Sequence, residues 1–230
     1  MKFKGSLFAG LLATAVFFNA GSARAEAVTG QANIAGNVNV DATSIVFNPT
    51  FTNTPGALET GSFAGLTGGT IMSLTGTGTG AVNVPGFIHF TAGVAAPITF
   101  DLTFIAPGVG TQAACASSTP GSLCTPANSP FTLLQLTSST VVASLQLNGN
   151  AYIGSPSTGS SDTRGVFSTQ TVVGGTLPEI ISTLSSGHSI NGITYSASFS
   201  ASPVPEPASM LLMGLGLAGA GLVARRKSKA

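Results

Sequence analysis

Residues 97–107, which read PITFDLTFIAP, decide the fold class of this chain. Four large apolar residues, from Ile98 to Phe104, alternate with threonine and aspartate, so an extended strand has one apolar and one polar face. Pro107 and Gly108 then end the run, as this pair commonly does in turns. The period is that of a half-buried β-strand and not that of an amphipathic helix.

Two further segments repeat this alternation next to an Asn-Gly pair. Residues 141–147 alternate before Asn148-Gly149, and residues 193–200 follow Asn191-Gly192. Asn-Gly favours the two-residue turns of β-hairpins, so both pairs predict hairpin turns. In the second segment the inward-facing side chains are expected to be those of Tyr195, Ala197 and Phe199.

Weaker strand patterns fill much of the remaining chain. They lie at residues 34–40, 44–47, 71–75, 87–91, 131–137 and 164–173. Polar tracts at residues 76–80 and 154–163 are expected to form loops. Many short strands at this spacing predict a mainly β fold, an antiparallel β-sandwich.

One segment predicts a short helix. Thr176 has the spacing of an N-cap with Glu179 as its capping-box partner, and Pro178 falls in the first turn, where a missing N–H costs nothing. Ile180, Ile181 and Leu184 then share one face, and Gly187 is expected at the C-cap. The apolar face indicates that this helix closes one end of the β domain.

Composition and charge exclude several classes of protein. Charged residues make up 7% of the 230-residue chain, against about 25% in an ordinary soluble domain, which argues against a helical bundle. Residues 26–203 carry a net charge of −5, because Arg164 is their single basic residue and six residues are acidic: Glu26, Asp41, Glu59, Asp101, Asp162 and Glu179. A nucleic-acid-binding protein needs a basic patch, so this class is excluded.

The N-terminus has the pattern of an export signal. Lys2 and Lys4 precede an apolar run at residues 7–18, and small residues follow, ending at Ala23-Arg24-Ala25. Ala23 and Ala25 fit the small-residue pockets of signal peptidase, so we predict a cleavable signal peptide over residues 1–25. The alternative is a permanent N-terminal anchor. We expect the mature chain to begin at Glu26, with a single domain over residues 26–203.

The C-terminal residues 204–230 form a tripartite tail. It begins with Pro205, Glu206 and Pro207, continues through 17 uncharged residues from 208 to 224, and ends with the basic residues Arg225, Arg226, Lys227 and Lys229. As a helix the uncharged run is about 25 Å long, at the short limit for a membrane span. The basic end is expected to stay cytoplasmic, which places residues 26–203 on the other side of the membrane.

This tail resembles the PEP-CTERM sorting signal of Gram-negative bacteria. The resemblance implies that Pro205, Glu206 and Pro207 are the recognition motif and that Arg225, Arg226 and Lys227 are the basic stop. It also implies processing by exosortase, a membrane-embedded enzyme similar to cysteine proteases, and an association with exopolysaccharide. The precursor would then be anchored in the inner membrane before it reaches the cell envelope surface or the extracellular space.

Cys115 and Cys124 are the two cysteines of the chain, and both lie in the exported segment. An even count in an oxidising compartment predicts a disulfide that closes a short loop. Free thiols and a metal site are the alternatives, and the metal site would need two further ligands close by.

Candidate chemistry in residues 26–203 is sparse. His89 is expected at a solvent-facing strand position, and His188 is expected in a loop. Either histidine could in principle form a Ser-His-Asp site with Asp101, but residues 26–203 contain no GxSxG nucleophile motif. The scattered acids do not suggest a paired-carboxylate glycosidase, and no cofactor motif occurs in the exported segment. Trp is absent and Tyr occurs only at residues 152 and 195, so an aromatic platform for sugar would depend on Tyr152, for which a half-buried strand end is the alternative.

Two hypotheses for function follow. The first is an exported, non-enzymatic surface or extracellular-matrix protein that is associated with exopolysaccharide. The second is a carbohydrate-binding module delivered by the same route, which sugar-dependent retention would distinguish. An exported hydrolase is a third and weaker alternative.

Overall fold

The computed structural model describes residues 27–41, 44–54, 57–76, 78–127, 129–156, 159–169, 175–203 and 214–219. The strands in these ranges are β1 (Gly30–Val40), β2 (Ser44–Phe47), β3 (Thr50–Asn53), β4 (Gly68–Ile71), β5 (Leu74–Thr75), β6 (Gly80–Ala92), β7 (Ile98–Ile105), β8 (Leu123–Cys124), β9 (Thr132–Thr137), β10 (Thr140–Ile153), β11 (Ser161–Thr169) and β12 (Ile190–Pro203). The helical elements are the 3₁₀ helices η1 (Gly61–Phe63) and η2 (Gln112–Ala116), the α-helix α2 (Leu177–Ser185) and the helical residues 214–219.

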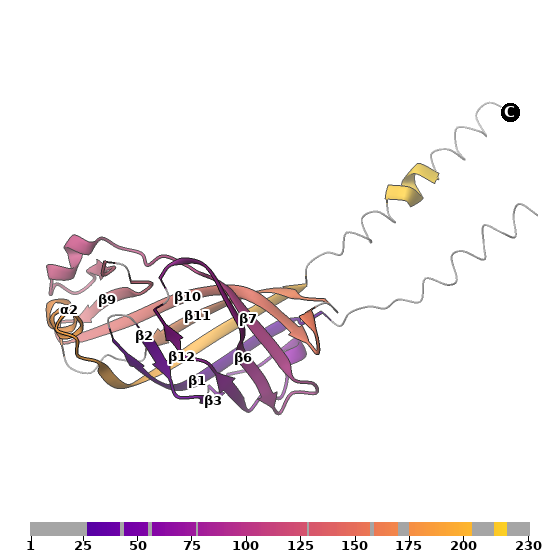
Figure 1. The fold of residues 1–230 in the computed structure, drawn as a ribbon, viewed down its shortest axis with the longest axis horizontal. Helices are drawn as coiled ribbons and strands as arrows, with labels where there is room; N and C mark the ends of the chain where they lie inside the picture. The colour runs from indigo at the N-terminus through magenta and orange to yellow at the C-terminus, as the bar shows by residue number, and fades with distance from the viewer. Residues whose placement is uncertain are drawn as a thin grey trace, which may run out of the picture.

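Eight of the strands form one closed antiparallel barrel (Figure 1). Their order around it is β1, β3, β4, β6, β7, β10, β11 and β12, and β12 pairs again with β1. The prediction of a mainly β, antiparallel fold is therefore confirmed, but the expected two-sheet sandwich is wrong. The pairing of β10 with β11 joins what would otherwise be the edges of an open sheet, and closure leaves these edges without unpaired backbone groups.

Aromatic side chains fill the barrel interior. Their ring centroids lie 5.1 to 6.3 Å apart, mostly in edge-to-face geometry. The residues in this cluster include Phe47, Phe51, Phe63, Phe87, Phe90, Phe100, Phe167, Tyr195 and Phe199. Tyr195, Ala197 and Phe199 all face inward, as the alternation predicts. An eight-stranded barrel is just wide enough for side chains to fill, so its interior is the hydrophobic core.

The strand at the centre of the sequence pattern departs from strict alternation near its end. Ile98, Phe100 and Leu102 are buried as expected, but Phe104 is 36% exposed and Ile105 is buried in its place. The register against β10 shifts between Leu102 and Phe104, so one extra residue of β7 forms a bulge there. A bulge reverses the faces of the residues that follow it, which explains the outward position of Phe104.

The prediction of hairpin turns at the two Asn-Gly pairs is wrong. Asn148 and Gly149 lie within β10, where they pair with Arg164 and Thr163 of β11. Gly192 lies within β12 with φ +68, beside an irregularity in the pairing of β12 with β1, and its N–H donates to Asn39 Oδ1 at 2.7 Å. Both pairs thus lie beside irregularities in the pairing of long strands, and Gly192 alone of the two glycines has the positive φ that glycine favours.

The predicted helix is present as α2, and it covers one end of the barrel (Figure 1). Glu179 Oε2 accepts from the Thr176 N–H at 2.7 Å and from the Thr176 hydroxyl at 3.2 Å. Leu177 and Ile180 join the core, and Ile181 and Leu184 pack against it. The C-cap residue is Ser186 and not the expected glycine, which follows it with a positive φ.

Candidate functional site

A surface cleft of about 640 Å³ lies at the α2 end of the barrel. One wall is formed by α2, and the opposite wall is formed by η2 and the segment that leads into β9. The cleft is lined by Asp41, Gln112, Cys115, Ala116, Pro126, Ala127, Ser129, Phe131, Pro178, Ile181, Ser182, Leu184 and Ser185. Uncharged side chains dominate this lining, and it includes no lysine, arginine or histidine.

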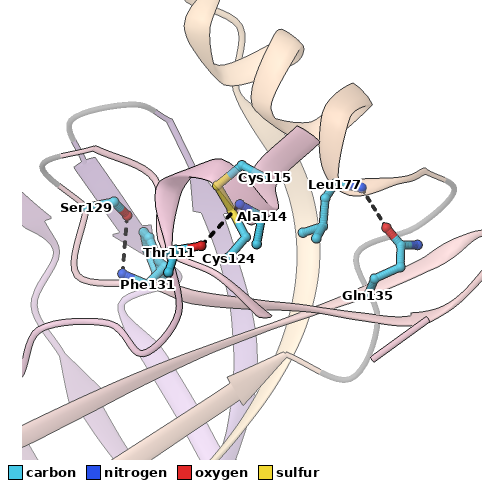
Figure 2. The surroundings of a disulfide bond; sticks show 8 residues. All are labelled: Thr111, Ala114, Cys115, Cys124, Ser129, Phe131, Gln135 and Leu177. Carbon is cyan, nitrogen blue, oxygen red and sulfur yellow. Dashed lines mark hydrogen bonds between the residues drawn. A yellow bond between two sulfur atoms is a disulfide. The ribbon is translucent and has the colours of Figure 1, made fainter. Parts of the chain in front are cut away.

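A disulfide holds the wall opposite α2 together, and Figure 2 shows its surroundings. Cys115 in η2 and Cys124 in β8 are bonded, with their Cα atoms 4.9 Å apart, as the cysteine count predicts. The Thr111 side chain caps η2 by accepting from the Ala114 N–H at 3.3 Å. The crosslink closes a loop of about ten residues, for which the chain-entropy model gives at most about 2.5 to 3 kcal/mol of stabilisation.

Gln135 ties the start of α2 to the barrel. Its side chain is fully buried, and its Oε1 accepts from the Leu177 N–H at 2.7 Å (Figure 2). Its Nε2 donates to the Thr137 carbonyl at 2.7 Å and to the Thr140 carbonyl at 3.4 Å. One amide therefore satisfies an N–H in the first turn of α2 and two carbonyls of the β9–β10 turn.

We expect Gln135→Met to lower the free energy of unfolding by about 2 to 3 kcal/mol. Methionine has a similar length but cannot donate to Thr137 or accept from Leu177, so the buried Leu177 N–H and the part-buried Thr137 carbonyl lose this partner. Urea denaturation of the purified full chain measures the change. Gln146→Met is the matched control, because Gln146 is exposed on β10, and its effect should stay within about 0.5 kcal/mol. Equal losses in both variants would contradict this role for Gln135.

An apolar cavity of about 50 Å³ lies inside the barrel below α2. Its walls come from β1, β2, β9, β10, β11, α2 and β12. Tyr195 lines it with a side chain that is 2% exposed, and the Tyr195 hydroxyl has no hydrogen-bond partner among the described residues. Pro126, Phe131 and Leu184 line both this cavity and the surface cleft.

The residues considered for catalysis do not converge on this site. His89 is exposed on β6, and its Nδ1 lies 3.2 Å from Thr99 Oγ1. Asp101 on β7 accepts from the Gly86 N–H at 2.6 Å and from the Tyr152 hydroxyl at 3.2 Å. Tyr152 is 8% exposed, and His188 follows α2, with its Nδ1 2.9 Å from Ser186 Oγ. Among the described residues no group of three or more His, Cys, Asp and Glu side chains is placed to hold a metal ion.

The sorting and processing residues lie outside the described residues. This applies to the signal-peptide positions Ala23 and Ala25, to Pro205, Glu206 and Pro207, and to Arg225, Arg226 and Lys227. Within the expected span, residues 214–219 are helical and exposed. No helix in the described part of the chain combines the length and the hydropathy that a membrane span requires.

Comparison with protein-family models identifies the C-terminal segment. Residues 203–227 match the model described as the PEP-CTERM protein-sorting motif. The tail is therefore a PEP-CTERM sorting motif, and its resemblance to this signal is confirmed. The motif indicates an exported protein that exosortase sorts. No curated protein and no solved structure matches the chain.

Sequence reasoning missed the two polar groups that distinguish the α2 end, Gln135 and the Tyr195 hydroxyl. Leu134 and Leu136 flank Gln135, so apolar residues occupy the alternate positions on this strand and its inward face is ambiguous. The inward position of Tyr195 is evident from its alternation, but its missing hydrogen-bond partner depends on contacts between distant strands.

Proposed function

We propose that residues 26–203 form a non-enzymatic surface or extracellular-matrix domain that is sorted by exosortase and associates with exopolysaccharide. The observation that carries the proposal is the position of the sorting motif. It begins at residue 203, which is also the last residue of β12. The tail thus continues directly from a strand of the barrel, so that the sorted cargo is the barrel itself.

The outward side chains of β1 and β12 support the association with polysaccharide. On β12 they are Thr194, Ser196, Ser198, Ser200 and Ser202, and on β1 they include Gln31, Asn33, Asn37 and Asn39. We call these two rows the polar face. Gln31 Nε2 donates to Ser198 Oγ at 2.8 Å, so the two rows contact each other. The polar face is uncharged and offers hydroxyl and amide groups, which form hydrogen bonds with sugar hydroxyls.

A dedicated carbohydrate-binding module is the less supported alternative. Such modules stack sugar rings on exposed aromatic side chains. Tyr152 and Tyr195 are 8% and 2% exposed, and therefore neither provides a platform. Hydrogen bonding along the polar face instead favours many weak contacts with a polymer over one tight site for a short sugar.

Retention in the producer's own exopolysaccharide tests the proposal. We expect the exported wild-type protein to remain in the polysaccharide fraction after a wash with 1 M salt and to be released when the polysaccharide is digested. The triple variant Thr194→Ala, Ser200→Ala, Ser202→Ala removes three exposed hydroxyls of the polar face and should be retained at least about threefold less.

The control variant is Thr52→Ala, Thr70→Ala, Thr91→Ala, which removes three exposed hydroxyls from β3, β4 and β6. It should be retained like the wild type. Equal retention of both triple variants, or retention that survives complete digestion of the polysaccharide, would count against the proposal. Release by millimolar free sugar would favour the carbohydrate-binding module.

A further inference from the structure

Outward-facing side chains form a row that crosses five neighbouring strands of the barrel. The row runs through Gln31 on β1, Ser200 on β12, Arg164 on β11, Asn148 on β10 and Phe104 on β7, and each residue pairs directly with the next. Residues that lie opposite each other in an antiparallel sheet point to the same face. Neighbouring strands are about 4.8 Å apart, so this cross-strand row is roughly 19 Å long.

Phe104 is the aromatic end of the cross-strand row. Within the described part of the chain it is the one aromatic side chain that is exposed, and it faces outward because of the bulge in β7. Its other neighbour, Ala81 on β6, is also exposed and contributes only a methyl group. An exposed ring of this kind gains free energy when an apolar surface covers it, and the carbon–hydrogen face of a sugar ring is such a surface.

The next two side chains of the row provide hydrogen-bonding groups. The Asn148 amide can donate and accept, and the Arg164 guanidinium has five N–H donors in one plane. Arg164 is exposed and forms no ion pair with the acidic side chains that the structure describes. Phe104 and Arg164 lie on either side of Asn148, with their Cα atoms roughly 10 Å apart. A sugar ring on Phe104 would therefore have Asn148 beside it, and the next ring of a polymer would reach Arg164.

Charge indicates which sugars fit this row. In the adjacent row, Asp101 on β7 and Asp162 on β11 lie on either side of Asn150. Asp162 is two residues from Arg164 on the same face of β11, so its carboxylate offsets the guanidinium charge. Residues 26–203 as a whole carry a net charge of −5. A polymer of acidic sugars would be repelled by this surface, whereas an uncharged polymer meets hydrogen-bonding groups without repulsion.

We propose that the cross-strand row binds a neutral polysaccharide, with one hexose ring stacked on Phe104 and its hydroxyls bonded to Asn148 and Arg164. The inference rests on the proposed function, because the row crosses the polar face at Gln31 and Ser200, and it names the class of polymer that this face meets. Phe104 adds one aromatic anchor to the many weak hydrogen bonds of the polar face.

The test measures binding of the full chain, held in lipid nanodiscs, to immobilised polysaccharides by biolayer interferometry. The neutral probes are hydroxyethyl cellulose, dextran and galactomannan, and the charged probes are carboxymethyl forms of the same three backbones. Empty nanodiscs give the blank. We expect at least one neutral polymer to bind, and its carboxymethyl form to bind at least about tenfold more weakly at low ionic strength, where repulsion is least screened.

Variants separate the parts of the site. Phe104→Ala removes the ring and should weaken binding of that neutral polymer at least about tenfold, whereas Phe104→Tyr keeps a ring and should stay within about threefold of the wild type. Arg164→Ala removes the hydrogen-bond donors and should weaken binding at least about threefold. Leu136→Ala is the matched control, because it truncates another exposed apolar side chain, on β9 and outside the row, and should bind like the wild type. Near-UV circular dichroism reports whether each variant is folded.

The proposal is overturned if no neutral polymer binds, if the carboxymethyl form binds as tightly as the neutral one, or if folded Phe104→Ala or Arg164→Ala binds like the wild type. Loss of folding in Phe104→Ala leaves Arg164→Ala to decide the question. The proposed function is judged separately, because failure of the wild type to remain in the producer's own exopolysaccharide would count against that function whatever these probes show.

Discussion

Replacing Glu206 with alanine is expected to reduce processing of the precursor by more than tenfold while leaving its insertion in the membrane unchanged. A charge in the linker just outside a bilayer contributes little to insertion, so a plain anchor would tolerate the loss. A processing enzyme that reads the motif at residues 203–227 would not, because Glu206 is the single charged residue of the Pro-Glu-Pro sequence. Cell fractionation, with the intact mass of each fraction, measures the outcome.

Asp162→Ala is the matched control for this experiment. Asp162 is an exposed carboxylate on β11, so its removal takes the same charge from the barrel and leaves the sequence of the tail unchanged. We expect its processing to equal that of the wild type. Normal release of the Glu206→Ala protein would mean that the tail serves as a membrane anchor and that Glu206 is not recognised.

Replacing Gly149 with alanine is expected to lower the free energy of unfolding by at least about 3 kcal/mol. Gly149 lies on β10 where β7 bulges, and a Cβ atom there would collide with the Asp101 carbonyl oxygen. It would also come within 2.7 Å of the Phe100 ring. Both obstacles belong to β7, so relief requires β7 and β10 to separate at this point of their pairing. Thermal and urea denaturation measure the loss, which corresponds to roughly 6 to 12 °C in Tm.

Gly78→Ala is the control, because no atom lies within 4 Å of the added Cβ and the residue does not have a positive φ. Its effect should stay within about 0.5 kcal/mol. A loss for Gly149→Ala that is no larger than this would show that β7 and β10 can shift apart at little cost, and that the bulge is not a fixed point of the barrel.

Local patterns predicted the strands well, because alternation depends on which face of each strand is buried. The inward positions of Ile98, Phe100, Tyr195 and Phe199 follow from period-two alternation, and α2 follows from its capping residues and apolar face. These features depend only on residues that are close to one another in the sequence. They are the part of the fold that a single sequence determines most directly.

Closure of the barrel was beyond such reasoning. A sandwich and a barrel share alternation and antiparallel neighbours, and they differ in the long-range pairings that join the sheet edges, here including that of β10 with β11. The same limit explains the Asn-Gly pairs. Asn148-Gly149 has the composition of a turn, but its partners Arg164 and Thr163 continue the strand through it. Such long-range pairing outweighs local propensity.

Part of the candidate site could also be predicted from the sequence. The pairing of Cys115 with Cys124 follows from their number and compartment. The cavity beside Tyr195 is lined by residues from seven elements that are distant in sequence, so no short sequence motif predicts it. The sorting motif is the opposite case, because its residues are contiguous in the sequence and are recognised from the sequence alone.

The direction of β12 determines which end of the barrel would point away from a surface to which the C-terminal tail is attached. The strand begins at Ile190, just after α2, and ends at Pro203, where the sorting motif begins, and Gly30 at the start of β1 pairs beside that same end. Fourteen strand residues span about 43 Å, or roughly 33 Å along the axis of a barrel with the usual strand tilt. A chain tethered by its tail would therefore hold the mouth of the cleft distal to the tether, open to molecules arriving from outside the cell.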